Sequence, residues 1–235
     1  MAGSSTASNL AMGKVVAKAA SFRIDNACNA FLHDCFKQFG IHVVALEGEP
    51  EVAFNRQKFE ACILRLYDPD AEKVLTAARN SSSNRRIVIY GIARNTKEAL
   101  QFSNLGINAI IDEPLDRQRV LKMVRATHLL VIHELRRYVR VPVVTEAVVE
   151  AAARKFSSMT VEVSAGGLSV FSEVPLADLE QVRVSFTLPN LPRISVRAHA
   201  CWRRASEKLY GLRFDTTDDA RLHVRKWIDQ YLDIM

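Results

Sequence analysis

The sequence lacks an apolar run long enough to cross a membrane, and it lacks paired cysteines. A transmembrane helix needs about 20 consecutive apolar residues, and no stretch of this 235-residue chain approaches that length. The four cysteines, Cys28, Cys35, Cys62 and Cys201, form no Cys-x-x-Cys pair, so neither a zinc knuckle nor a redox motif is expected. We therefore expect a cytoplasmic protein with no membrane span, whose thiols are reduced and buried.

The chain also lacks the residue sets of a metal centre, of an active site and of a DNA-binding arm. Its six histidines are scattered, and no cysteine or carboxylate pattern completes a metal site with them. No nucleophile, base and orienting group form a catalytic set, so we expect neither an enzyme nor a cofactor. The net charge of +6 is spread over both halves, which argues against DNA binding and suits a phosphate-bearing ligand without requiring one.

The composition is that of a soluble globular protein, with 49% apolar and 25% charged residues. The length allows two ordinary domains, and the patterns described below divide the chain at about residue 130, into 15–130 and 131–235. Residues 1–14 are small and polar and lack the charged start and apolar block of a secretory signal. We expect them to form a mobile tail.

In the first domain, short apolar strands alternate with helical periods. The expected strands are 41–46, 61–66, 86–92 and 108–115, and the expected helices are 26–39, 70–80, 96–105 and 117–135. Gly40 and Gly106 each stand where a helix should end. Strands that alternate with helices predict an α/β doubly wound, flavodoxin-like parallel sheet with helices on both faces.

In the second domain, the pattern changes to successive strands separated by turn residues. The expected strands are 139–149, 158–163, 168–172, 181–188, 194–202 and 209–214. A closing helix, 218–232, carries Leu222, Trp227, Ile228, Tyr231 and Leu232 on its apolar side. This pattern predicts a small antiparallel β-barrel with a terminal α-helix. No flexible linker separates the domains, so we expect their relative orientation to be fixed.

The first domain resembles the receiver domain of response regulators in the order and length of its elements. A receiver needs acidic residues after its first strand, an Asp ending the third, a Ser or Thr after the fourth, and a Lys before a proline after the fifth. In phosphoryl transfer the carboxylate attacks while Mg²⁺ and the ammonium neutralise charge. The corresponding positions here hold Arg23, Ile24 and Asp25, then Arg65, then Gly91, and then Glu113.

The charges at Arg65 and Glu113 are therefore opposite to those of a working receiver. The resemblance implies a pseudo-receiver that keeps the scaffold, takes no phosphoryl group and serves for contact with a protein partner or with a second copy of the chain. We expect Arg65 and Glu113 to form a salt bridge with swapped polarity, and the alternative is two unrelated surface charges.

The second domain carries two motifs in a fixed order. Residues 134–143 contain Arg136 and Arg140 in an Arg-x-x-x-Arg arrangement, with Arg137 between them, and residues 160–170 contain the run Glu162-Val163-Ser164-Ala165-Gly166-Gly167. Together they resemble the two signatures of the PilZ family, R-x-x-x-R followed by [D/N]-x-S-x-x-G. The run 199–214, with Trp202, Gly211 and Phe214, resembles the end of the PilZ barrel, and the resemblance covers residues 134–232.

The resemblance implies a bacterial receptor for cyclic di-GMP. The implied ligand-binding residues are Arg136, Arg137, Arg140, Glu162, Ser164 and Gly167. Arginine presents a planar fork to phosphate oxygens and to guanine, and it also stacks on purine faces. Because side chains alternate along a strand, we expect Val161 and Val163 inside the barrel and Glu162 and Ser164 facing the ligand.

Other interpretations stay open. Glu162 replaces the Asp or Asn of the family, which slightly favours a ligand-independent adaptor that binds proteins. Taken singly, the arginines fit a solvated helix end, and Ser164 with its glycines fits an ordinary hairpin turn. A DNA-binding response regulator is disfavoured, since the second domain has strands where a helix-turn-helix should be.

Overall fold

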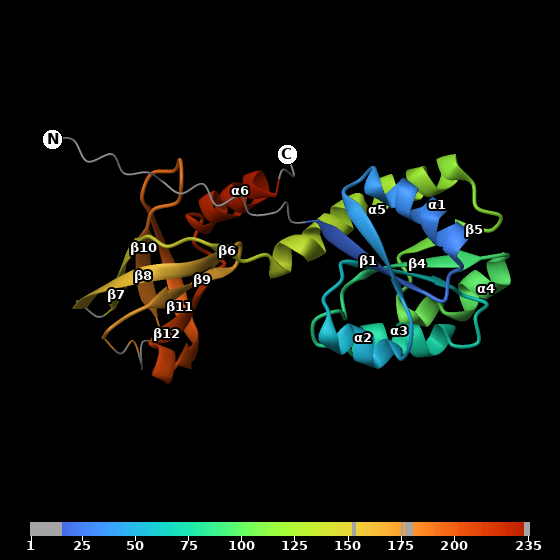
Figure 1. Cartoon of the computed structure of the whole chain (residues 1–235). Coiled ribbons are helices and arrows are strands. Elements are labelled where there is room, and N and C mark those ends of the chain that lie inside the picture. The colour runs from blue at the N-terminus through green and yellow to red at the C-terminus, as the bar shows by residue number, and fades with distance from the viewer. Residues whose placement is uncertain (1–15, 152–153, 175, 177–180, 233–235) are drawn as a thin grey trace.

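The computed structural model describes residues 16–151, 154–174, 176 and 181–232, and they form two lobes joined by a long helix (Figure 1). The tail predicted at residues 1–14 lies outside the described residues. The N-terminal lobe holds a parallel sheet of β1 Ala17–Phe22, β2 Ile41–Leu46, β3 Ala61–Arg65, β4 Val88–Ala93 and β5 Ala109–Asp112. Its order, β2-β1-β3-β4-β5, is that of flavodoxin-like doubly wound folds.

Helices cover both faces of this sheet, which confirms the doubly wound prediction. Their bounds are α1 Asn26–Lys37, α2 Pro50–Arg56, α3 Ala71–Asn80, α4 Thr96–Gln101 and α5 Arg117–Tyr138, with a 3₁₀ turn at Ser103–Leu105. One apolar core joins α1 and α5 to the sheet, and a second lies on the opposite face under α2 and α3. Helix α2 was not predicted, because seven residues with Phe54 as their one large buried side chain give no repeating period.

The C-terminal lobe is an antiparallel barrel, as predicted. Its strands are β6 Val141–Pro142, β7 Glu146–Ala151, β8 Arg154–Ser164, β9 Gly167–Phe171, β10 Val182–Phe186, β11 Ile194–Arg204 and β12 Leu209–Phe214. They follow the order β6-β8-β7-β10-β11-β12-β9, and pairing of β8 with β9 closes the ring. The single strand predicted at 139–149 is broken, because β6 ends at Pro142, which has no backbone N–H to continue the ladder.

Helix α5 runs past residue 130 to Tyr138 and so passes from one lobe into the other (Figure 1). Val131, Ile132 and Leu135 of its second half share one apolar cluster with Ile228 and Leu232 at the C-terminal end of the chain. That cluster is continuous with the core between the N-terminal sheet and α5. The two lobes are therefore joined by buried apolar contacts as well as by the chain.

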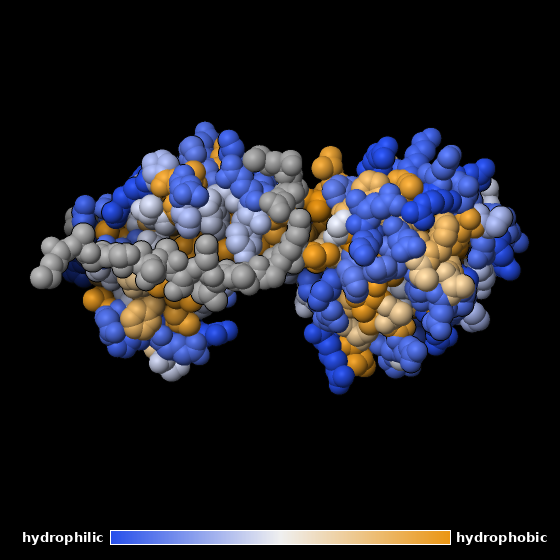
Figure 2. Space-filling model, turned by 45° about the horizontal axis from the view of Figure 1, so that its top comes forward, coloured by the Kyte–Doolittle hydropathy of each residue, from blue (hydrophilic) through white to orange (hydrophobic). Residues whose placement is uncertain are grey.

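The terminal helix, α6 Arg221–Tyr231, begins after the predicted residue 218, and one residue of its predicted apolar side also differs. Leu222 was expected on its apolar side and is 44% exposed, whereas Val224 is fully buried against the barrel core. Apolar surface is also visible at the narrow waist between the lobes (Figure 2). The large exposed apolar residues of α5 are Leu129, Leu130 and Tyr138.

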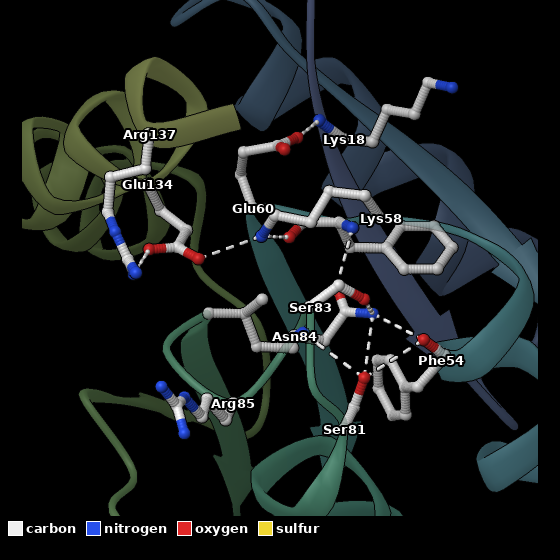
Figure 3. A network of polar contacts seen from close by, with 12 residues as sticks. Lys18, Phe54, Lys58, Glu60, Ser81, Ser83, Asn84, Arg85, Glu134 and Arg137 are labelled. Atoms are coloured by element: carbon white, nitrogen blue, oxygen red, sulfur yellow. Dashed lines mark hydrogen bonds and ion pairs between the residues drawn. The ribbon is translucent and has the colours of Figure 1, made fainter. Parts of the chain in front are cut away.

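A buried asparagine ties the connection between α2 and β3 to the segment after α3. The Asn84 side chain is fully buried; its Nδ2 donates to the backbone oxygens of Phe54 at 2.7 Å and Gln57 at 2.9 Å, and its Oδ1 accepts from the Phe59 N–H at 2.8 Å (Figure 3). Without Asn84 the Phe59 N–H and the Gln57 oxygen would lose this partner, which is costly for groups shielded from water, whereas the Phe54 oxygen would keep the hydroxyl of Ser81, at 3.1 Å.

Replacing Asn84 by alanine is expected to lower the free energy of unfolding by about 2–4 kcal/mol, because the Phe59 N–H and the Gln57 oxygen lose their partner at once. Urea unfolding measures this loss. The matched control is Asn104→Ala, at an exposed position, which should stay within about 0.5 kcal/mol of the wild type. Equal effects of the two substitutions would contradict this role of Asn84.

Candidate functional site

The carboxyl edge of the N-terminal sheet brings Asp25, Arg65 and Glu113 together. Arg65, the last residue of β3, donates from Nη2 to Oδ2 of Asp25 at 2.6 Å, and its Nε lies 3.7 Å from Oε1 of Glu113. The predicted Arg65–Glu113 salt bridge is thus present, but it is the longer of these two contacts. Arg65 ends β3 and Glu113 follows β5, and β4 lies between these two strands. The hydroxyl of Tyr67 donates to Oε2 of Glu113 at 2.6 Å.

These contacts shift three pKa values. The backbone N–H of Cys28 and then the guanidinium of Arg65 lower the pKa of Asp25, and the bond to Asp25 raises the pKa of Arg65. Burial, together with the hydrogen bond to Glu113, raises the pKa of Tyr67 to about 12. The end of β3 therefore presents a cation held between two acidic side chains.

The acidic residues that follow β3 are held by Arg23, the residue directly after β1. Arg23 forms an ion pair with Asp70, and its Nη1 lies 3.8 Å from Oδ1 of Asp68. Arg23 itself has a φ of 51°, in the left-handed region that non-glycine residues seldom occupy. In this arrangement a cation stands beside the two acidic residues of the loop after β3.

The assignment of Gly91 to the position after the fourth strand is wrong. Gly91 lies inside β4, opposite Leu64, and the strand continues to Ala93. A Cβ at residue 91 would stand 2.7 Å from the side chain of Leu66. The glycine therefore serves close packing within the sheet and does not end the strand.

A pocket of about 250 Å³ lies where the end of α5 meets β8, β9, β11 and β12. Its lining residues are Arg137, Arg140, Ser164, Gly166, Gly167, Leu168, Cys201, Trp202, Gly211, Leu212 and Arg213. Four of the six residues predicted to bind the ligand meet here: Arg137, Arg140, Ser164 and Gly167. Arg136 and Glu162 do not line the pocket.

The pocket is positively charged. Arg137, Arg140 and Arg213 reach it from two separate parts of the chain, and no acidic side chain is among its described lining residues. Arg137 donates from Nη1 to Oε2 of Glu134 at 2.8 Å, whereas Arg140 and Arg213 have no ion pair within the described part of the chain. Three guanidinium groups beside an indole suit a ligand that combines phosphate with an aromatic ring.

The turn between β8 and β9 forms one wall of the pocket. The hydroxyl of Ser164 donates to the backbone oxygen of Gly167 at 2.9 Å, which closes the hairpin. A Cβ on Gly167 would stand 2.3 Å from the backbone oxygen of Leu212, so this position needs glycine for β9 to approach β12. Ser164 and Gly167 therefore form an ordinary hairpin turn and also line the pocket.

Arg136 has a different position from the one expected. Because α5 continues to Tyr138, Arg136 is helical and not part of an extended segment, and Arg140 follows the end of the helix. Arg136 forms an ion pair with Asp229 of α6, and the two side chains are 17% and 20% exposed. The apolar residues that continue the period of α5 are covered by α6, which explains why the helix extends so far.

Glu162 also departs from the expectation, because the register between β8 and β9 shifts between Thr160 and Glu162. The bulge interrupts the alternation of side chains. Thr160 is fully buried and its hydroxyl accepts from the Thr145 N–H at 2.9 Å, while Val161, expected inside the barrel, is half-buried. Val163 lies in the barrel core as predicted, and Glu162 is half-buried away from the pocket.

The sequence argument missed Trp202 and Arg213 as pocket residues. Trp202 on β11 pairs with Gly211 on β12, and a Cβ on Gly211 would collide with the indole. Trp202 is 40% exposed and contributes to the pocket lining. A glycine facing a tryptophan across two expected strands was a usable signal, but the register of the pair could not be read from the sequence.

Comparison with known proteins identifies the second domain. Residues 134–233 match the sequence profile of the PilZ domain, which confirms the resemblance drawn from the two motifs. The chain thus consists of a receiver-like domain followed by a PilZ domain. No curated protein matches the chain significantly.

Several solved structures are similar in fold. The chemotaxis response regulator CheY4 of Vibrio cholerae is 14% identical, with a TM-score of 0.43 over 48% of this chain and 98% of that one. The receiver domain of the sensor histidine kinase PA1611 of Pseudomonas aeruginosa is 16% identical, with a TM-score of 0.39 over 46% and 96%. The inhibitor of motility MotI/DgrA of Bacillus subtilis is 20% identical, with a TM-score of 0.34 over 42% and 52%.

Among the described residues, no helix is both long and apolar enough to span a membrane. No group of three or more histidine, cysteine, aspartate or glutamate side chains within the same residues is placed to hold a metal ion.

The two glycines of the β8–β9 turn give a matched test of this geometry. Gly167→Ala places a methyl group against the backbone of β12, and we expect it to lower the free energy of unfolding by about 1–3 kcal/mol. Gly166→Ala meets no atom within 4 Å and should be nearly neutral. Thermal unfolding of both variants measures the difference, and an equally stable Gly167→Ala variant would contradict the close approach of β9 and β12.

Proposed function

We propose that this chain is a non-catalytic signalling effector of the cytoplasm that binds cyclic di-GMP through its PilZ domain. The observation that supports it best is the meeting of two sequence motifs at one cationic pocket. Arg137 and Arg140 come from the first motif, and Ser164 and Gly167 come from the second. They are separated by more than twenty residues in sequence and reach the same pocket through the fold.

The chemistry of the pocket suits a guanine nucleotide. Arg140 and Arg213 each offer a fork of N–H donors to a phosphate or to guanine O6 and N7. Trp202 offers an aromatic face for a base to stack on, a contact worth about 1–3 kcal/mol. A volume of about 250 Å³ lies just below the usual range of about 300–1,000 Å³ for small-molecule sites, so it suits one nucleotide half of the two-fold ligand.

In this proposal Arg136 supports the pocket from outside it, and Glu162 lies away from the pocket. Arg136 stays with Asp229 and ties α6 to α5. Arg213 takes its place as the third guanidinium near the ligand. Because removal of one partner of a partly buried ion pair leaves the other charge uncompensated, a variant at Arg136 should lose stability as well as affinity.

For the receiver-like domain we propose a role in contact with a protein partner or with a second copy of the chain, without phosphoryl transfer. Receiver chemistry needs a free carboxylate at the end of the third strand, beside a bound cation and an ammonium. Here the end of β3 holds Arg65, paired with Asp25. Asp68 and Asp70 in the following loop are paired with Arg23.

Incubation with acetyl phosphate and Mg²⁺ therefore should leave the mass of the intact protein unchanged. An active receiver domain treated in parallel serves as the positive control. A mass increase of one phosphoryl group on this chain, mapped to Asp25, Asp68 or Asp70, would overturn the non-phosphorylatable assignment.

The alternative is a ligand-independent adaptor that binds a protein through the PilZ barrel. Two observations favour it: Glu162 lies away from the pocket, and the motif residue Arg136 is already neutralised by Asp229. The adaptor predicts no heat on titration with cyclic di-GMP. The receptor predicts saturable binding that depends on the pocket arginines.

Arg140→Ala separates these two functions. Loss of a hydrogen-bonded charge contact of about 1.5–3 kcal/mol should weaken cyclic di-GMP binding roughly ten- to a hundredfold, as measured by isothermal titration calorimetry. Arg193→Ala, which removes an exposed arginine outside the pocket, is the matched control and should bind like the wild type. Equal affinity of the Arg140 variant and the control would exclude the proposed site.

A further inference from the structure

A single buried carboxylate connects the pocket to the N-terminal domain. Glu134 of α5 is buried, and its Oε2 accepts from Nη1 of Arg137 at 2.8 Å while its Oε1 accepts from Nζ of Lys58 at 3.0 Å (Figure 3). Arg137 lines the pocket. Lys58 belongs to the connection between α2 and β3 on the other domain. Glu134 therefore shares its charge between a cation of the pocket and a cation of the receiver-like domain.

Lys58 is held in place by its own domain. Its Nζ also donates to the backbone oxygen of Phe59, whose N–H is bound by the buried side chain of Asn84. The ammonium lies 4.4 Å from the centre of the Tyr138 ring, and the guanidinium carbon of Arg137 lies 5.6 Å from the same centre. The two cations thus flank one carboxylate beside one aromatic ring at the end of α5.

Charge balance decides how Arg137 can be used. A buried carboxylate needs a counter-charge, because an unpaired buried charge costs several kcal/mol. With Lys58 in place, Glu134 keeps a hydrogen-bonded cation when Arg137 turns to a phosphate, although the same ammonium also interacts with the buried carboxylate of Glu60. Without Lys58, Arg137 is the counter-charge that Glu134 retains, and a phosphate has to compete with the carboxylate for it.

On the basis of the cyclic di-GMP binding proposed above, we propose that Lys58 of the receiver-like domain is a positioning residue of the PilZ pocket, because it neutralises Glu134 and frees Arg137 for the ligand. The coupling is reciprocal by linkage. When Arg137 binds the ligand, Lys58 is left as the cation that pairs with Glu134, so the ion pair between Lys58 and Glu134 becomes stronger. Binding therefore tightens the contact between the receiver-like domain and α5, and a partner that displaces the Lys58 segment lowers ligand affinity.

The test is a double-mutant cycle with cyclic di-GMP as the probe, measured by calorimetry on the full chain. We expect Lys58→Met to weaken binding roughly five- to a hundredfold, and we expect Lys58→Arg, which keeps the charge, to restore most of the affinity. In a Glu134→Gln background there is no carboxylate to neutralise, so adding Lys58→Met should have no further effect.

Lys18→Met is the matched control. Lys18 contacts this network through its backbone N–H, which donates to Glu60, and its exposed ammonium points away (Figure 3). The control should bind like the wild type. Thermal unfolding of each variant shows whether it is folded, and hydrogen exchange at the Phe59 amide gives a second readout, which should slow when the ligand binds to the wild type and not to Lys58→Met.

The outcomes separate the coupling from the receptor assignment. Wild-type protein that does not bind cyclic di-GMP overturns the receptor assignment, and the coupling with it. Wild-type binding that Lys58→Met leaves unchanged overturns the coupling alone. So does an equal loss from Lys58→Met in the wild-type and Glu134→Gln backgrounds, because that result would mean that Lys58 acts without Glu134.

Discussion

Helix α5 belongs to both domains, and the geometry of the cationic pocket at the barrel depends on this. Its first half packs against α1 and the N-terminal sheet through Val120 and Val124, and its second half packs against the end of the chain. Because α5 is one continuous helix, the packing of its first half on the N-terminal sheet fixes the position of its last turn. That turn carries Arg136 and Arg137, and Arg140 follows it at the mouth of the barrel.

Carboxylates control which cations remain for a ligand. Asp229 holds Arg136 and Glu134 holds Arg137, whereas Arg140 and Arg213 have no ion pair among the described residues. The same principle operates at the edge of the N-terminal sheet, where Asp25 and Glu113 hold Arg65. In that domain the pairing leaves Arg65 between two carboxylates. In the PilZ domain it leaves part of the guanidinium set exposed, consistent with a site for an anionic ligand.

Periodicity in the sequence was enough to predict both folds, because amphipathic helices and apolar strands follow from local spacing. The pocket was predicted in part: Arg137, Arg140, Ser164 and Gly167 meet there, and their motifs are local. The errors arose where tertiary contacts decide. Helix α6 covers the last turns of α5, so α5 continues through Arg136. A β-bulge before Glu162 changes which residues of β8 face inward. The register of β11 against β12 brings Trp202 to the pocket. None of these contacts leaves a periodic trace in the sequence.

We propose that cyclic di-GMP binds beside Trp202, and the chain offers a direct optical test of this position. The sequence has two tryptophans, and Trp227 of α6 lies outside the pocket, so Trp227→Phe leaves Trp202 as the single indole reporter. Titration of this variant should give a saturable change in tryptophan emission that Arg140→Ala shifts to higher ligand concentration. Emission that does not respond to cyclic di-GMP at concentrations where calorimetry detects binding would place the ligand elsewhere and contradict a site beside Trp202.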